Sequence, residues 1–127
     1  MFSMKHDLNL SNAGGSRYFS PIHVDEDNTE DFDVVGTVAK ACSMSTFLAR
    51  VDGLSAGVTA TLTLRKGATI ATMANTALTC NLTSAILSCT SAGAVAMSAG
   101  DLFDIRLSYT SGDGNSGRVF LTSLACD

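Results

Sequence analysis

Strict alternation of side-chain polarity over Leu102–Tyr109 is the feature that most constrains the fold of this chain. The larger apolar side chains share one face of an extended backbone, at Phe103, Ile105, Leu107 and Tyr109. The opposite face holds Leu102, Asp104, Arg106 and Ser108. A repeat of two residues is that of a half-buried β-strand, whereas a helix repeats every 3.6 residues. The preceding Ala99-Gly100-Asp101 predicts a tight reversal, so the segment is expected to form a hairpin with a shorter strand around Val95 and Met97.

The same alternation recurs over Val58–Arg65, and short apolar runs separated by Gly, Ser and Thr continue from Val34 almost to the C-terminus. Short strands with turns at about ten-residue spacing are typical of an all-β sandwich or barrel. The 127 residues are enough for one domain with its own core.

One predicted strand region, Thr37–Val51, departs from simple alternation. Met44 and Leu48 fall on one side of it, and Phe47 and Val51 fall on the other. This pattern predicts a strand that is covered on both faces or bent by a bulge, and a covered second face would be buried by another subunit.

Residues 1–33 differ from the rest and are predicted to form an extended N-terminal arm, with 34–127 as the sandwich domain. The segment holds Gly14-Gly15, the sole proline Pro21 and the acidic run Asp25–Asp33. Its apolar residues are too frequent for a plain linker and too scattered for one helix face. They are predicted to anchor the arm on a partner surface through Phe2, Met4, Tyr18, Phe19 and Ile22. The alternative is that the arm packs on its own sandwich as an extra strand.

The acidic run offers hard oxygen ligands for calcium, and the candidate ligands are Asp25, Asp27, Glu30 and Asp31. An EF-hand loop needs a central glycine and a glutamate at its twelfth position, and the run has neither. A solvated acidic loop is therefore the preferred interpretation, with no bound metal. A zinc site is also disfavoured, because no Cys-x-x-Cys pair occurs and the only histidines are His6 and His23.

The pentapeptide GLSAG around Ser55 matches the nucleophile-elbow pattern of hydrolases. That motif requires a strand that turns sharply into a helix, but the residues after Gly57 alternate as a strand does. Ser55 is therefore predicted to lie in a hairpin turn. No glycine-rich phosphate loop precedes Lys66, and the eight Lys and Arg residues are scattered among twelve acidic ones. We expect no enzyme activity, no cofactor and no nucleic-acid partner.

Hydrophobic residues make up 46% of the chain and charged residues 16%, at a net charge of −4. That composition is apolar for a small monomer, and it predicts that some apolar surface meets a second subunit. No apolar run approaches the roughly 20 residues that a membrane-spanning helix needs, so no membrane segment is expected. The first residues lack a basic region followed by an apolar core, which predicts synthesis and retention in the cytoplasm.

Four cysteines in a small Thr- and Ser-rich domain favour disulfides, with four reduced core cysteines as the alternative. A tight reversal centred on Ser84-Ala85 places Cys80 opposite Cys89 in an antiparallel pair. Opposite residues of such a pair lie about 4.5–5.5 Å apart at Cα, within disulfide range, so a Cys80–Cys89 bond is predicted. Release of the protein in a particle by cell lysis would reconcile disulfides with cytoplasmic synthesis.

Five segments carry a resemblance to known proteins, in the order TATLTLRKG, LTCNL, ILSCT, VAMSAGDLFDIRLSYTSG and RVFLTSL. The stretch that contains them, from Val34 to Cys126, resembles the small jelly-roll domains of phage particles, either capsid decoration (cement) proteins or fibre heads. More distantly, it resembles the trimeric tumour-necrosis-factor-like jelly rolls of spore surface proteins. The resemblance implies an antiparallel jelly-roll β-sandwich with threefold assembly. The first and last strands of a jelly roll are neighbours, which would bring Cys42 near Cys126 and form a second disulfide.

The function that this resemblance implies is structural or adhesive. The preferred expectation is a homotrimeric phage capsid decoration protein that is made in the host cytoplasm, lies on the virion surface and binds the major capsid protein of the assembled head. The alternative is a fibre or tail-tip head domain that binds a receptor or carbohydrate. A carbohydrate site favours exposed aromatic side chains, yet the chain has no Trp and only Tyr18 and Tyr109.

Overall fold

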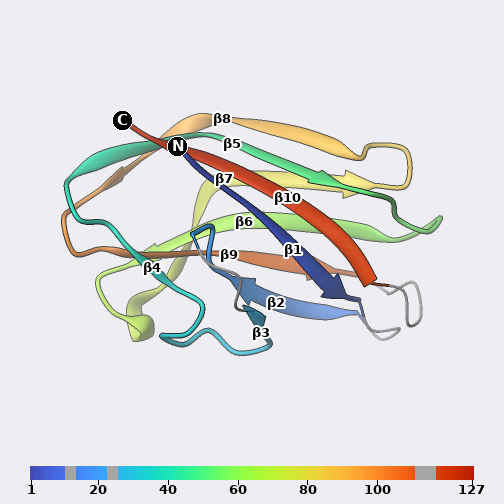
Figure 1. The fold of residues 1–127 in the computed structure, drawn as a ribbon, viewed down its shortest axis with the longest axis horizontal. Helices are drawn as coiled ribbons and strands as arrows, with labels where there is room; N and C mark the ends of the chain where they lie inside the picture. The colour runs from blue at the N-terminus through green and yellow to red at the C-terminus, as the bar shows by residue number, and fades with distance from the viewer. Residues whose placement is uncertain (11–13, 23–25, 111–116) are drawn as a thin grey trace.

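The computed structural model describes residues 1–10, 14–22, 26–110 and 117–127, and its regular structure is almost entirely β-strand. Two antiparallel sheets face each other as the layers of a sandwich (Figure 1). The first sheet has the order β1 (Phe2–Asn9), β10 (Gly117–Cys126), β5 (Cys42–Val51) and β8 (Ser88–Met97). The second has the order β3 (Glu26–Asp27), β2 (Gly15–Phe19), β9 (Leu102–Tyr109), β6 (Thr59–Gly67) and β7 (Ala74–Thr83). β4 (Gly36–Thr37) also pairs with β9, and the short 3-10 helix η1 spans Ile70–Thr72.

The strand order is that of an antiparallel jelly-roll β-sandwich, which confirms the predicted fold class. From β7 to β10, each strand enters the sheet opposite to that of its predecessor. The reversal before β9 is also confirmed, because the Asp101 N–H donates to the Ser98 carbonyl at 3.0 Å and Gly100 has a φ of 91°. The predicted hairpin is wrong, however, since β8 and β9 leave this turn for different sheets.

The core lies between the two sheets and is filled from both. The alternating face of β9 points into it as predicted, with Ile105 and Leu107 at 0% exposure. Four phenylalanines from different strands are buried there, and their exposed fractions do not exceed 1%: Phe19, Phe47, Phe103 and Phe120. Apolar burial of this kind contributes about 25 cal/mol for each Å² removed from water, so the facing strands stabilise one another.

The predicted separation of an arm from the sandwich is wrong for β1 and β2. All of β1 pairs with β10, from Phe2 opposite Leu124 to Asn9 opposite Gly117, and β2 pairs with β9. Leu8, Leu10 and Phe19 are at 0% exposure in the core. The alternative weighed from the sequence, that this segment packs on its own sandwich, is the one the structure shows, with two strands rather than one.

A bulge in β5 decides which of its side chains enter the core. Thr46 adopts a φ of 53°, and β5 takes three steps from Ser45 to Leu48 where β10 takes two, from Ala125 to Ser123. Because the extra residue changes the phase of alternation, Met44 and Phe47 both point inward at 0% exposure. The predicted opposite placement of these two side chains is therefore wrong, and Leu48 is left on the solvent side.

Deletion of residues 1–22 tests the role of the N-terminal strands. We expect the truncated chain to lose its cooperative unfolding transition, because the deletion removes β1, β2 and three core side chains at 0% exposure, Leu8, Leu10 and Phe19. Circular dichroism during thermal unfolding measures this loss. Removal of Met1 alone is the matched control, since that side chain is 91% exposed. A truncated protein that melts as the full chain does would contradict the result.

Candidate functional site

The candidate functional surface is the solvent side of the first sheet, which we call the outer face. Alternate residues of β10, β5 and β8 form it, because successive side chains of a strand point to opposite sides. Its members are small or apolar: Leu121, Ser123, Ala125, Ser43, Ser45, Leu48, Thr90, Ala92, Ala94 and Ala96. The register places Leu48 between Ser123 and Thr90, and Leu121 is 44% exposed.

Charged side chains lie at the border of this face. Lys5 and Asp7 are exposed on β1, and Arg50 is exposed near the end of β5, opposite Leu121. A hollow of about 240 Å³ opens beside Leu121 and is lined by Arg50, Val51, Asp52 and Val119. The outer face therefore combines a neutral centre with a charged border, which is the arrangement found in protein interfaces.

The predicted arm anchors do not form a free apolar surface. The Phe19 ring is buried 4.3 Å from the His6 ring, and the Phe2 ring lies 5.7 Å from that of Phe103. The partner-binding role predicted for Phe19 is wrong, because a core side chain with 0% exposure cannot contact a partner.

The three other predicted anchors differ in exposure. Met4 and Tyr18 are half-buried, and the Arg65 guanidinium lies 5.8 Å from the centre of the Tyr18 ring. Ile22 is 42% exposed and is the one predicted anchor that remains largely open to solvent. The structure therefore disperses these residues over β1, β2 and the segment after it.

The acidic run does not form a metal centre in the described part of the chain, where no group of three or more His, Cys, Asp or Glu could hold an ion. Asp27 and Asp31 each accept a local backbone hydrogen bond, from Thr29 N–H at 3.1 Å and Asp33 N–H at 2.9 Å. Asp25, another of the candidate ligands, lies outside the described residues.

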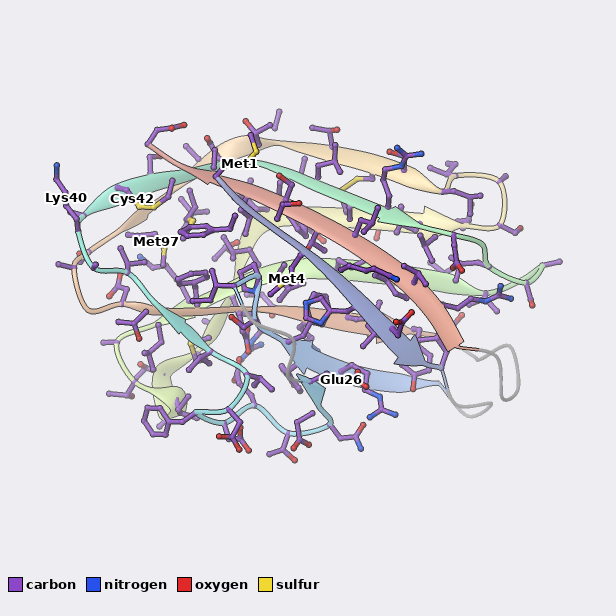
Figure 2. The ribbon with its side chains drawn as sticks, in the orientation of Figure 1. Met1, Met4, Glu26, Lys40, Cys42 and Met97 are labelled. Carbon is purple, nitrogen blue, oxygen red and sulfur yellow. A yellow bond between two sulfur atoms is a disulfide. The ribbon has the colours of Figure 1, made fainter. Side chains whose placement is uncertain are left out.

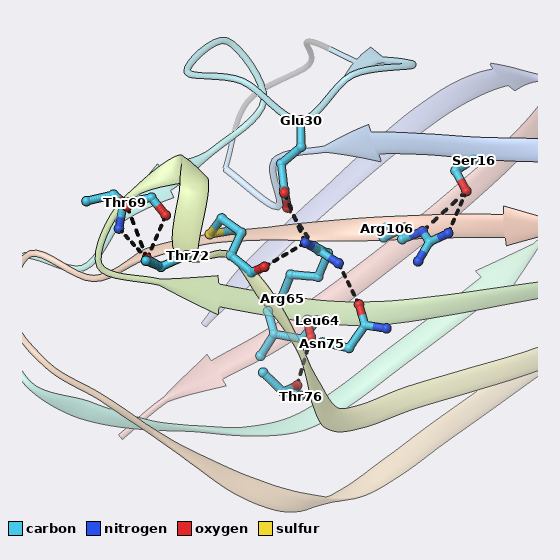
Figure 3. A network of polar contacts seen from close by, with 10 residues as sticks. Ser16, Glu30, Leu64, Arg65, Thr69, Thr72, Asn75, Thr76 and Arg106 are labelled. Atoms are coloured by element: carbon cyan, nitrogen blue, oxygen red, sulfur yellow. Dashed lines mark hydrogen bonds and ion pairs between the residues drawn. The ribbon is translucent and has the colours of Figure 1, made fainter.

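Glu30 is not solvated, as the acidic loop was predicted to be, because its carboxylate binds a guanidinium. Arg65 Nε donates to Glu30 Oε1 at 2.6 Å, and Arg65 Nη2 donates to Oε2 at 3.0 Å (Figure 3). Arg65 also donates to the Asn75 side-chain oxygen at 2.8 Å and to the Met73 carbonyl at 2.9 Å. A bidentate pair in which both side chains are only 13–14% exposed is stronger than a surface ion pair. The pair fastens the acidic segment to β6.

Asp104 completes this cluster from β9, with its side chain at 0% exposure. The pKa of its carboxyl is raised to about 8, mainly by burial and further by the nearby Glu30 carboxyl, while the Arg65 guanidinium opposes the rise. Sequence reasoning assigned Asp104 to the solvent face of its strand. It missed this burial because the segment that covers Asp104, the acidic segment, is distant in the sequence. The only signal in the sequence for this burial was the opposite charge of Arg65.

Ser55 lies in a turn, but the predicted hairpin is wrong, because β5 and β6 belong to different sheets. The Val58 N–H donates to the Ser55 carbonyl at 3.1 Å, and residues 52–58 join β5 to β6 without a helix. His6 is buried on β1, where its Nε2 lies 3.1 Å from the Ser20 carbonyl oxygen, and His23 is outside the described residues. Among the described residues, no helix has the length and apolar character that a membrane crossing requires.

Both predicted disulfides are present, and every cysteine belongs to one of them. The Cys80–Cys89 pair has a Cα separation of 5.6 Å, but its predicted geometry is wrong. Thr83 and Ile86 do exchange the hydrogen bonds of a tight reversal, yet β7 and β8 then diverge into different sheets. The bond therefore joins the two layers of the sandwich rather than opposite residues of a hairpin.

The Cys42–Cys126 bond joins neighbouring strands of the first sheet, with a Cα separation of 5.5 Å. Both cysteines line a surface hollow of about 420 Å³, together with Phe2, Lys40 and Asp127 among others. Lys40 and Cys42 lie at the end of the sandwich that holds both chain termini (Figures 1 and 2). The bond therefore closes the sheet at a solvent-accessible end.

Comparison with known proteins finds a distant similarity among solved structures. No protein-family model matches the sequence, and no curated protein matches it. Among solved structures, the chain is similar to the "Structure of Eiger TNF from S. frugiperda" at 17% sequence identity and a TM-score of 0.46. The similarity covers 98% of this chain and 94% of that chain. The distant likeness to tumour-necrosis-factor-like jelly rolls is thus found, and the likeness to phage particle proteins stays a prediction.

The buried carboxyl predicts how stability depends on pH. The pKa of Asp104 rises from 3.8 to about 8 on folding, so between these values the folded protein holds a proton that the unfolded chain has lost. The free energy of unfolding should then fall by up to about 1.4 kcal/mol per pH unit as the pH rises through this window. Asp104→Asn should flatten this dependence and stabilise the protein most at the alkaline end.

Urea unfolding at a series of pH values measures this effect. Asp33→Asn is the matched control, because it removes the same charge at an exposed position in the acidic segment. An Asp104→Asn variant that keeps the slope of the wild-type protein would contradict the assignment.

The different exposure of the two disulfides predicts their order of reduction. Cys42 and Cys126 are both half-exposed in a hollow, whereas in the other bond only Cys89 is half-exposed and Cys80 is at 0% exposure in the core. Thiolate attack needs access to sulfur, so a small thiol should reduce Cys42–Cys126 first in the folded protein. Timed alkylation followed by peptide mass spectrometry measures the order, with the denatured protein as the control. Earlier labelling of Cys80 and Cys89 would contradict the prediction.

Proposed function

We propose that this chain is a structural protein of a virus particle, a capsid decoration protein that binds and stabilises the assembled head. The observation that supports the proposal is the neutral outer face. A surface of Ala, Ser, Thr and Leu with charges at its border suits burial against another protein, because it costs little to desolvate. The outer face offers a contact surface with apolar area, as expected of a protein that assembles with others rather than one that catalyses a reaction.

Self-association is part of the proposal. Leu48 and Leu121 are the large apolar side chains of the outer face, and each contributes about 1.5–3 kcal/mol when an interface removes it fully from water. The hollow beside Leu121 can receive one partner side chain. We assign three subunits to the assembly on the resemblance of the sequence to trimeric jelly rolls, and a closed ring satisfies every copy of the interface.

A decoration protein must also resist dissociation from a loaded particle. Two disulfides hold this sandwich, one across the layers and one between β5 and β10. In the chain-entropy account, a bond with a sequence separation of 84 residues stabilises the fold by about 4–5 kcal/mol. A rigid subunit loses little conformational entropy on docking, which favours tight attachment.

Charge on the outer face tests the proposal directly. We expect Leu48→Glu to remain folded and to associate at least about tenfold more weakly than the wild-type protein, since burial of a leucine is worth more than 1.4 kcal/mol. Ser3→Glu is the matched control, because it adds the same charge to an exposed position on β1 at the border of the same sheet. Sedimentation velocity measures the subunit number.

Electron microscopy of particles from the encoding virus, with gold-labelled protein, measures attachment. We expect the wild-type protein and Ser3→Glu to give a regular shell of label over the head, and Leu48→Glu to lose it. Label at a tail tip would contradict decoration and support receptor or carbohydrate binding. Equal association of all three proteins would contradict the role of the outer face.

A further inference from the structure

The stretch 67–100 contains none of the charged residues of the chain. It forms β7, β8 and the turn between them, and each of these strands has ten residues and lies at the edge of its sheet. An edge strand presents unpaired backbone N–H and C=O groups, and proteins protect such edges with charges, proline or short length. Neither β7 nor β8 has any of these three protections within the strand, and the irregularity of each is confined to one register shift against its neighbour.

The other sheet edges are protected. β1 carries the exposed charges of Lys5 and Asp7, and β3 consists of two acidic residues. The edge of β7 is covered in part by β8, because Thr79 N–H donates to Ser91 Oγ at 3.3 Å and the Cys80–Cys89 bond joins the strands. The open edge is therefore that of β8, which forms the upper border of the first sheet in Figure 1.

The hydrogen-bond register shows which backbone groups of β8 point outward. At one end, Val51 N–H donates to the Leu87 carbonyl at 3.0 Å, so the alternate residues Ser88 and Thr90 turn their amides and carbonyls away from β5. At the other end, Ser43 exchanges both of its backbone hydrogen bonds with Asp127 of the neighbouring segment. Its partner on β8, Ala96, therefore also points outward.

Part of this edge is already satisfied within the molecule. Lys66 Nζ donates to the Ala96 carbonyl at 2.6 Å and lies 3.6 Å from the Asp101 carboxylate. A lysine at the end of an edge strand limits pairing beyond that point. The open part of β8 is thus Ser88–Ala94, with small side chains throughout.

We propose that this edge pairs with β8 of a second copy, antiparallel about a twofold axis. Opposing Ser88 with Ala94 and Thr90 with Ala92 uses only the outward groups of the open part and joins two four-stranded sheets into one. The charge distribution favours a second copy as occupant. Each copy has a net charge of −4, so two copies repel each other. The stretch 67–100 of one copy can nevertheless meet the same stretch of another without bringing like charges into contact.

Proline on the edge tests this pairing. Ala92→Pro removes one outward N–H but no hydrogen bond to β5, so the sandwich should fold with both disulfides intact. Because the twofold axis repeats the loss, we expect association through β8 to weaken at least about tenfold. Ala92→Ser is the matched control, since it keeps the N–H. Sedimentation equilibrium in a Leu48→Glu background isolates this contact from the outer face.

The expected result in that background is a dimer for Ala92→Ser and a monomer for Ala92→Pro. Equal association of two folded variants, or a monomeric Ala92→Ser, would overturn the proposal. Hydrogen exchange of the unmutated protein gives a second test that needs no folded proline variant. The amides of Ser88, Thr90 and Ala92 should gain protection with rising protein concentration, and unchanged exchange would overturn the pairing. If the outer-face proposal fails, sedimentation equilibrium and hydrogen exchange still test the β8 pairing.

Discussion

The pairing of β10 with both β1 and β5 is the interaction on which the rest of the structure depends. β10 is the last strand of the chain and β1 the first, so the first sheet is complete only when the two ends of the sequence meet. Until then Leu8, Phe47 and Phe120 have no common core to enter. Closing so long a loop costs conformational entropy before any contact offsets it. The Cys42–Cys126 bond holds the same junction and lowers the entropy of the unfolded chain.

The solvent sides of the two sheets differ in chemistry. The second sheet carries Arg65, Asp104 and Arg106 on its outer side, and Glu30 of the acidic segment binds Arg65 there (Figure 3). The charge of Arg65 is paired with Glu30 within the subunit, and Arg106 donates to the Ser16 hydroxyl. The first sheet has a neutral centre with charged side chains at its border. No segment of the described chain covers this centre. Ion pairing is thus used to close one side of the sandwich, while the other side is left suited to an intermolecular contact.

Short-range patterns in the sequence predicted the elements that depend on neighbours along the chain. Alternation identified β9 and β6, and the Gly100 turn identified the reversal before β9. β1 was missed because its partner β10 lies at the opposite end of the sequence, and its inward positions include the polar His6. The phase of β5 was missed because the positive φ of Thr46 has no signal in residue type.

The candidate site was predictable only in composition. An apolar excess predicted a surface that meets another subunit, but the side chains chosen for contact were those of the N-terminal segment. Phe19 is large and apolar, as a contact residue would be, yet it is in the core. The residues of the outer face are small and were overlooked, because Ala and Ser carry little hydrophobic signal one at a time. Only the register of β10, β5 and β8 gathers them into one surface.

The geometry of the two proposed contacts decides what kind of assembly they build together. A face that docks on a different surface of the next copy forms a ring when the rotation between copies closes and a filament when it does not, whereas two β8 edges related by a twofold axis form a contact that ends with the pair. The closed ring and the twofold pair are each finite oligomers. When rings carry outward edges that pair by twofold symmetry, each ring links to several others and the assembly extends in two dimensions. A sheet of linked rings is the form that can cover a particle, so the neutral edge and the neutral face serve one function under these proposals.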